Sequence, residues 1–182
     1  VNTETKAYEF KEIPVTVPGK NTVETNDNKA LKVLPELQEW KGRTGEFIVS
    51  GSSRIIYEDD MLKNAAEEMK ADYEALTGKT IEVVKGTKSD VNAGDFFFEK
   101  TADTTLGLKD EGYLMEINDS VTVTSETQTG AYWATRTILQ ALKQNDYVSI
   151  PKGITRDYPL YKVRGFILDV GRKTFTLDYL KQ

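Results

Sequence analysis

Residues 59–78 read DDMLKNAAEEMKADYEALTG, and this stretch does most to decide the fold. Its apolar side chains recur at steps of three and four residues, which is the spacing of one face of an α-helix. Asp59 or Asp60 can cap the amino end, and Gly78 stands where a helix commonly ends. The apolar stripe consists of Leu62, Ala65, Ala66, Met69, Tyr73 and Leu76. A single stripe predicts a helix that packs one face on a sheet.

Short apolar segments before this helix predict two strands. Phe47 with Val49 forms the first, and residues 55–57 form the second. The serine-rich residues 50–53 between them are typical of a turn. Residues 42–45, with a glycine at each end, are expected to form an earlier turn.

Four more strands are predicted after the helix, over residues 81–84, 95–99, 112–117 and 121–123. The last two alternate apolar and polar side chains around a polar turn, which is typical of a β-hairpin. The predicted strand over residues 95–99 contains three consecutive phenylalanines, which could form a platform for stacking sugars. Because consecutive strand residues point to opposite faces, burial on both sides of a sheet is the favoured interpretation.

A second amphipathic helix is predicted over residues 129–143. Thr129 is its expected cap, and Tyr132 and Trp133 are expected to add bulk to its buried side. The stripe on that side consists of Ala131, Ala134, Ile138, Leu139 and Leu142. The strands occur in pairs as well as alternating with helices. We therefore predict an α+β fold, a mixed sheet of about six strands with two long helices packed on it, rather than a doubly wound parallel sheet.

The chain divides into three predicted segments. Residues 1–30 are expected to be a linker or an edge strand, and residues 31–160 the α+β domain. Residues 161–182 are expected to begin a second domain, because residues 163–170 resemble a buried strand with charges at both ends and a helix start follows near Thr176. Such a βα unit could open a (β/α)8 barrel, which needs about 250 residues. The alternative is that this strand completes the first sheet.

The residue counts exclude several kinds of chemistry. The 182 residues contain no His and no Cys, so this chain cannot supply a Ser-His-Asp triad, a Cys-His pair, a disulfide or a zinc site of the usual ligands. The net charge of −5, from 24 basic and 29 acidic residues, disfavours nucleic acid as a partner. No apolar run approaches the roughly 18 residues of a membrane span. We expect neither a metal nor another cofactor.

Adjacent carboxylates are candidate catalytic groups, because two acids can hydrolyse a glycosidic bond without histidine. The chain contains the pairs Asp59-Asp60, Glu67-Glu68 and Asp110-Glu111. Their settings favour other roles, namely a helix cap, the solvated face of a helix and a turn before the hairpin. We therefore predict no catalytic acid pair in these residues.

Four segments in register resemble a known family. EGYLMEI at 111–117, VTV at 121–123 and GAYWATRTILQ at 130–140 resemble the end of the accessory α+β domain that precedes the barrel of glycoside hydrolase family 20 β-N-acetylhexosaminidases. DYP at 157–159 with RGFILDVGR at 164–172 is similar to the family's domain junction and first barrel strand. The resemblance extends from about Leu31 to Gln182.

The resemblance implies a retaining exo-glycosidase that removes terminal β-linked N-acetylglucosamine or N-acetylgalactosamine, with the 2-acetamido oxygen of the sugar as nucleophile. It implies that Arg164 binds hydroxyls of the terminal sugar, a task that suits a planar guanidinium; the alternative is an interdomain ion pair. Asp169 and Arg172 match the motif and are expected to be structural, while Lys173 stands where the family often has His. The general-acid Glu and its Asp partner are expected beyond the C-terminus, so we expect these residues alone to be inactive.

Further expectations concern self-association, cellular location and alternative functions. A barrel strand without its neighbours has unpaired backbone groups, so residues 163–170 are expected to be disordered or to mediate self-association. Because the sequence begins at Val1 without a signal-peptide pattern, we expect preceding residues to have been removed. The resemblance implies a protein that is extracellular or on the cell surface. The alternatives for function are an independent carbohydrate-binding or scaffolding module, or the accessory domain of a different glycosidase.

Overall fold

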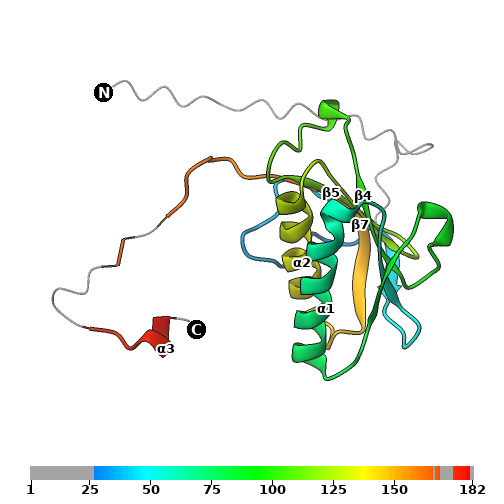
Figure 1. Cartoon of the computed structure of the whole chain (residues 1–182), viewed down its shortest axis with the longest axis horizontal. Helices are drawn as coiled ribbons and strands as arrows, with labels where there is room; N and C mark the ends of the chain where they lie inside the picture. Colours follow the sequence, from blue (N-terminus) through cyan, green and yellow to red (C-terminus); the bar gives the residue numbers. More distant parts are fainter. Residues whose placement is uncertain (1–26, 166, 169–173, 181–182) are drawn as a thin grey trace.

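The computed structural model describes residues 27–165, 167–168 and 174–180. One seven-stranded sheet carries two long helices on one face (Figure 1). The main elements are β1 Lys41–Ile48, β2 Arg54–Tyr57, α1 Lys63–Thr77, β3 Glu82–Lys85, β4 Phe96–Lys100, β5 Tyr113–Ile117, β6 Val121–Ser125, α2 Gln128–Lys143, β7 Ser149–Asp157 and α3 Leu177–Leu180. Short 3-10 turns occur at Asp60–Leu62, Lys88–Asp90 and Thr104–Leu106.

The sheet is mixed, as the sequence predicts. Its strand order is β1-β7-β5-β6-β4-β2-β3. The strands from β1 to β6 in this order pair antiparallel, and those from β6 to β3 pair parallel. Helix α1 lies in the crossover between the parallel neighbours β2 and β3, and α2 connects β6 to β7 across the intervening β5. Both helices lie side by side over the same face (Figure 1). The predicted α+β class is confirmed, with seven strands rather than about six.

Helix α1 forms where its periodicity predicts. Its buried residues are Ala65, Ala66, Met69 and Tyr73. The carboxylate of Asp59 accepts from the Met61 N–H at 2.8 Å and caps the 3-10 turn that leads into the helix. Gly78 ends it in the left-handed conformation, with φ +69°. The prediction for Leu76 is wrong, because its side chain is 52% exposed; Tyr73 and Ile81 fill the core at this end.

Helix α2 differs from the prediction at its amino end. Thr127, not Thr129, is the cap: its hydroxyl accepts from the Gly130 N–H at 3.1 Å. A cap hydroxyl reaches the N–H three residues later, and this spacing places Thr129 inside the helix. Trp133 was predicted to be buried but is 41% exposed. It lies outside the stripe that faces the sheet, where Ala131, Ala134, Ile138 and Leu142 are fully buried.

Strands β1 and β7 show what the pattern of apolar residues missed. Residues Gly42–Gly45, which the sequence predicts to be a turn, are part of β1. The pairing of β1 with β7 shifts register between Gly42 and Glu46, and this irregularity accommodates the positive φ of Gly45 within the strand. β7 has no predicted counterpart, and it contains Pro151. This proline is tolerated because β5 pairs with β7 only from Gly153 onwards, so Pro151 has a single neighbouring strand.

Phe96, Phe97 and Phe98 are all fully buried. Phe96 and Phe98 face the helices and belong to the main core. This finding confirms core burial over the alternative of a sugar-stacking platform. Among the described residues, no helix combines the length and the apolar character needed to cross a membrane.

After β7 the chain leaves the sheet, and α3 lies apart from it (Figure 1). Residues 163–165 and 167–168 adopt no regular secondary structure. The predicted barrel strand therefore stays a prediction, and Asp169 and Arg172 lie outside the described residues.

Candidate functional site

A groove of about 700 Å³ runs along the outer side of α2, and we call it the α2 groove. Four segments build it: the loop before β1, the start of β5 with the residues just before it, helix α2, and the end of β7 with the chain that leaves it. Its lining residues are Leu34, Pro35, Glu36, Gln38, Glu111, Tyr113, Trp133, Arg136, Thr137, Gln140, Asp157, Tyr158, Pro159, Leu160, Tyr161 and Arg164. It has the size and mixed lining of a typical binding site.

A hydrogen-bonded set of side chains forms the floor of the groove. The Tyr113 hydroxyl lies 2.7 Å from Thr137 Oγ1 and donates to Asp157 Oδ2 at 3.2 Å. Asp157 Oδ1 accepts from the Gln38 N–H at 3.0 Å. These bonds tie β5, α2, β7 and the loop before β1 together at one end of the sheet.

Burial changes the acidity of both groups on this floor. It raises the pKa of the Asp157 carboxyl, against the opposing effect of the Gln38 and Tyr113 hydrogen bonds. Burial, with the nearby charge of Asp157, also raises the pKa of Tyr113. The phenol therefore stays a neutral donor at physiological pH.

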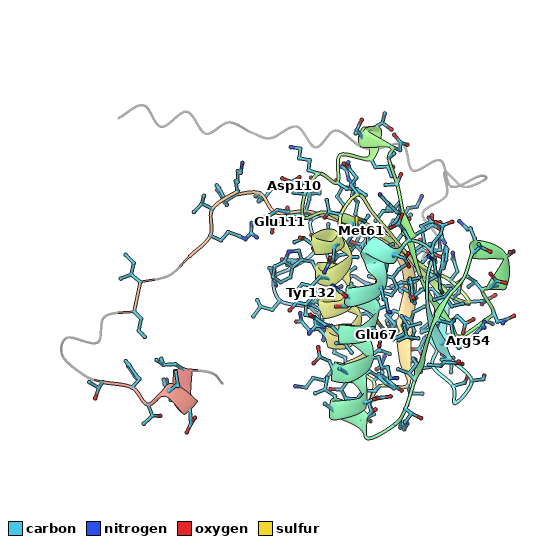
Figure 2. All side chains as sticks on the ribbon, viewed as in Figure 1. Arg54, Met61, Glu67, Asp110, Glu111 and Tyr132 are labelled. Atoms are coloured by element: carbon cyan, nitrogen blue, oxygen red, sulfur yellow. The ribbon has the colours of Figure 1, made fainter. Side chains whose placement is uncertain are left out.

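The rim of the groove is held by Glu111. Its carboxylate accepts from the Trp133 indole N–H at 3.2 Å and forms an ion pair with the Arg164 guanidinium. Arg164 also donates to the Tyr161 carbonyl at 2.8 Å. The bond from Arg164 holds the pKa of Glu111 below its usual range. Figure 2 shows Glu111 near the amino end of α2, close to where the chain leaves the domain.

Arg136 completes the lining from the middle of α2. It forms an ion pair with Asp72 of α1, donates from Nε to Thr135 Oγ1 at 3.1 Å, and lies 4.7 Å from the centre of the Tyr132 ring. Its Nη2 atom is buried and has no acceptor within the part of the chain that the structure describes.

The acidic pairs Asp59-Asp60 and Glu67-Glu68 lie outside the groove. Asp59 caps a helical turn, and Asp60 forms an ion pair with Lys85 at 2.8 Å. Glu67 and Glu68 lie exposed on α1, and Figure 2 labels the first of them. Over residues 27–165, 167–168 and 174–180, no cluster of acidic side chains is arranged to hold a metal ion.

Sequence reasoning missed most of this site. Arg164 was singled out, and the structure places it at the rim, paired with Glu111. The sequence predicts a turn at Glu111 and a buried position for Trp133. It places Asp157 in a family motif but predicts no role for its side chain. No spacing in the sequence links these three residues, because β5, α2 and β7 come together only through the sheet order.

The fold and the groove together define an α+β domain in which the two carboxylates that line the groove near β5 and β7, Glu111 and Asp157, are held by hydrogen bonds within the domain. Residues 30–158 match the family model described as glycosyl hydrolase family 20, domain 2. The chain therefore belongs to glycoside hydrolase family 20, and the resemblance seen in its sequence is confirmed.

Two relatives of this chain are named beta-hexosaminidases. The chain is 24% identical over 164 residues to a beta-hexosaminidase from Porphyromonas gingivalis, covering 85% of this chain and 21% of that protein. It is 22% identical over 165 residues to one from Vibrio furnissii, covering 90% and 25%. The chain thus spans about a fifth to a quarter of the length of these relatives.

Solved structures show the same fold. The GH20 beta-N-acetylhexosaminidase from Streptomyces coelicolor aligns with a TM-score of 0.65 at 20% identity, over 86% of this chain and 32% of that one. A GH20 exo beta-N-acetylglucosaminidase from Vibrio harveyi aligns with a TM-score of 0.65 at 17% identity, over 90% and 25%.

Proposed function

We propose that this chain is the accessory domain of a β-N-acetylhexosaminidase. The observation that carries the proposal is the family match over residues 30–158, supported by relatives that are named beta-hexosaminidases. The whole polypeptide would then hydrolyse terminal β-linked N-acetylglucosamine or N-acetylgalactosamine from glycans. By the family's mechanism the reaction retains configuration, because the substrate's own acetamido oxygen attacks first.

These residues by themselves do not catalyse hydrolysis in this proposal. A general acid needs a protonated carboxyl that is free to reach the glycosidic oxygen. Glu111 has a lowered pKa and is bound by Arg164 and Trp133. Asp157 has a raised pKa, but its two oxygens are occupied by the Gln38 N–H and the Tyr113 hydroxyl. Neither carboxyl is arranged for acid catalysis.

Several finer points belong to the same proposal. Residues 1–30 are a linker or edge strand, 31–160 the accessory domain, and 161–182 the first βα unit of the barrel. Asp169 and Arg172 stabilise the end of the first barrel strand. Self-association through residues 163–170 and an extracellular or cell-surface location also stay proposals.

The mechanism is tested on the polypeptide encoded by the whole reading frame. With a chromogenic β-N-acetylglucosaminide, proton NMR of the first-formed sugar should show the β-anomer. An α-anomer as first product would contradict a retaining mechanism, and the absence of any hydrolysis would contradict the assignment itself.

A further inference from the structure

The chain enters β1 and leaves β7 at the same corner of the sheet. Side chains join the two segments there, beyond the pair Lys41 and Ile154 at which the pairing of β1 with β7 begins. The joined residues lie between 116 and 119 positions apart in the sequence. We call this set the entry–exit clasp, and it consists of Gln38, Glu39, Thr155, Arg156, Asp157 and Tyr158.

An ion pair between Glu39 and Arg156 forms the centre of the clasp. Nε of Arg156 donates to both oxygens of Glu39, at 3.1 and 3.0 Å, and Nη2 donates to the same carboxylate. Nη1 donates to the Leu106 carbonyl at 3.0 Å. The Arg156 side chain is only 11% exposed, and that of Glu39 is 28% exposed. Loss of either partner leaves a largely buried charge without its counter-ion, so the ion pair favours both segments being in place together.

Two further contacts of the clasp hold the main chain of the entry loop. Thr155, which is buried, donates from Oγ1 to the Glu39 carbonyl at 2.6 Å. The Gln38 N–H donates to Asp157 Oδ1 at 3.0 Å. Residues 38–40 belong to no strand, so side chains of β7 hold this backbone in place of a strand ladder. A segment held in this way can open while the sheet stays folded.

On the exit side, Tyr158 is the last residue that the clasp holds. The centre of its ring lies 5.2 Å from Cζ of Arg156, and its hydroxyl donates to Glu39 at 3.4 Å. Both of these side-chain contacts are with members of the clasp. Pro159 and Leu160, which follow, are exposed. The first residue of the exit chain is thus tied to a residue of the entry loop that lies 119 positions earlier.

We propose that the entry–exit clasp is a conformational device that couples the two ends of the domain. When it is closed, it fixes the direction in which the chain leaves β7. When the entry loop is displaced, the Glu39–Arg156 pair is lost and the chain is free to move from Tyr158 onwards. The loop before β1 therefore controls the mobility of the segment that follows the domain. This inference goes beyond the proposed function and does not depend on hydrolysis.

Such a coupling is reciprocal, because two sites that share one opening equilibrium affect each other equally. Loosening the entry side raises the exchange rate of exit amides, and loosening the exit side raises that of entry amides. A local loss of contacts would change only the amides next to the substitution. The Gln38 and Tyr158 N–H groups are the reporters, because the first donates to Asp157 and the second begins the exit chain.

Amide hydrogen exchange of the 182-residue chain, followed by NMR, tests the proposal. Glu39→Ala should speed exchange of the Tyr158 N–H by about 5- to 150-fold, the range of a typical coupling between sites. Glu116→Ala is the matched control, because it breaks another glutamate–arginine pair, that with Arg43, outside the clasp. It should leave the Tyr158 N–H unchanged. The N–H of Met115, a fully buried residue of β5, should exchange at the wild-type rate in both variants.

Exchange of the Tyr158 N–H at the wild-type rate in Glu39→Ala would overturn the proposal. An equal acceleration at Met115 would also overturn it, because the whole domain would then be losing stability. If Glu39→Ala does not fold, Glu39→Gln takes its place under the same criteria, since it removes the charge and keeps the shape of the side chain.

A substitution on the exit side gives the second readout. Tyr158→Ala should speed exchange of the Gln38 N–H by a similar factor, because it removes the ring and the hydroxyl that contact Arg156 and Glu39. Leu160→Ala is the control, since Leu160 lies on the same exit chain but outside the clasp and is exposed. An unchanged Gln38 N–H in Tyr158→Ala would show a one-sided contact and contradict the coupling.

Discussion

Asp157 joins two of the segments that line the groove through its carboxylate oxygens. Its oxygens accept from the Gln38 N–H and the Tyr113 hydroxyl, and burial raises its pKa. A carboxyl whose pKa is raised in the folded state binds more protons there than in the unfolded chain. Its contribution to stability is therefore largest at low pH and is lost as pH rises from about 4 through the folded-state pKa.

Asp157→Asn tests this titration. Asparagine keeps an oxygen for the Gln38 N–H and brings an amide that can donate to the Tyr113 oxygen. We expect the free energy of unfolding of the variant to increase steadily relative to that of wild type between pH 4 and pH 7, because only wild type loses stability as its carboxyl ionises. Urea unfolding at several pH values measures the difference, and a difference that does not change with pH would contradict a raised pKa.

Arg164 is the second residue with a definite prediction, made for the polypeptide of the whole reading frame. If its guanidinium binds substrate hydroxyls, Arg164→Ala removes hydrogen bonds to a charged donor, each worth about 1.5–3 kcal/mol. We expect kcat/KM to fall by about 10- to 100-fold, mainly through a higher KM. Arg43→Ala is the control, because Arg43 pairs with Glu116 and Asn118 outside the groove. An unchanged kcat/KM for Arg164→Ala would refute the binding role.

Secondary-structure elements could be predicted where the pattern that defines them lies within one short segment of the sequence. The stripe of α1, the Asp59 cap of the 3-10 turn before it and the Gly78 stop lie within one short segment, and the hairpin of β5 and β6 is equally local. β7 was missed because Pro151 is acceptable only when the pairing of its neighbours is known. The groove was missed for the same reason: its residues meet through the strand order, which periodicity does not specify.

The cap of α2 offers a matched pair of threonines. The Thr127 hydroxyl accepts from the Gly130 N–H and donates to the Asp110 carbonyl at 2.6 Å. Thr127→Ala should lower the free energy of unfolding by about 1 kcal/mol, within a range of roughly 0.5–2. Thr129→Ala should change it by less than about 0.5 kcal/mol, because Thr129 is exposed. Equal costs for the two variants would contradict the assignment of the cap.

The close approach of α2 to β5 makes another element-scale prediction. A Cβ added at Gly130 would lie 2.2 Å from the Gly112 carbonyl oxygen, a distance that the backbone must shift to relieve. We expect Gly130→Ala to destabilise the domain by about 1–3 kcal/mol or more. Gly51→Ala is the control, since no atom lies within 4 Å of a Cβ there. Thermal unfolding compares the two, and a Gly130→Ala variant as stable as its control would show that this contact is absent in solution.

At the scale of the whole molecule, the sheet, its two helices and the α2 groove form one domain. One face of the sheet is covered by α1 and α2, and the outer side of α2 carries exposed apolar residues where the chain leaves β7. The family match covers this same domain. This arrangement is that of a domain within a hydrolase family whose groove carboxylates near β5 and β7, Glu111 and Asp157, are held by internal hydrogen bonds.

The most direct test of the central claim is the rate at which two proteins release the chromophore from a chromogenic β-N-acetylglucosaminide. One is the 182-residue chain, and the other is the polypeptide encoded by the whole reading frame. The account predicts no turnover above background by the short chain and clear, saturable turnover by the longer protein. Turnover by the short chain, or none by the longer protein under conditions where both are folded, would contradict it.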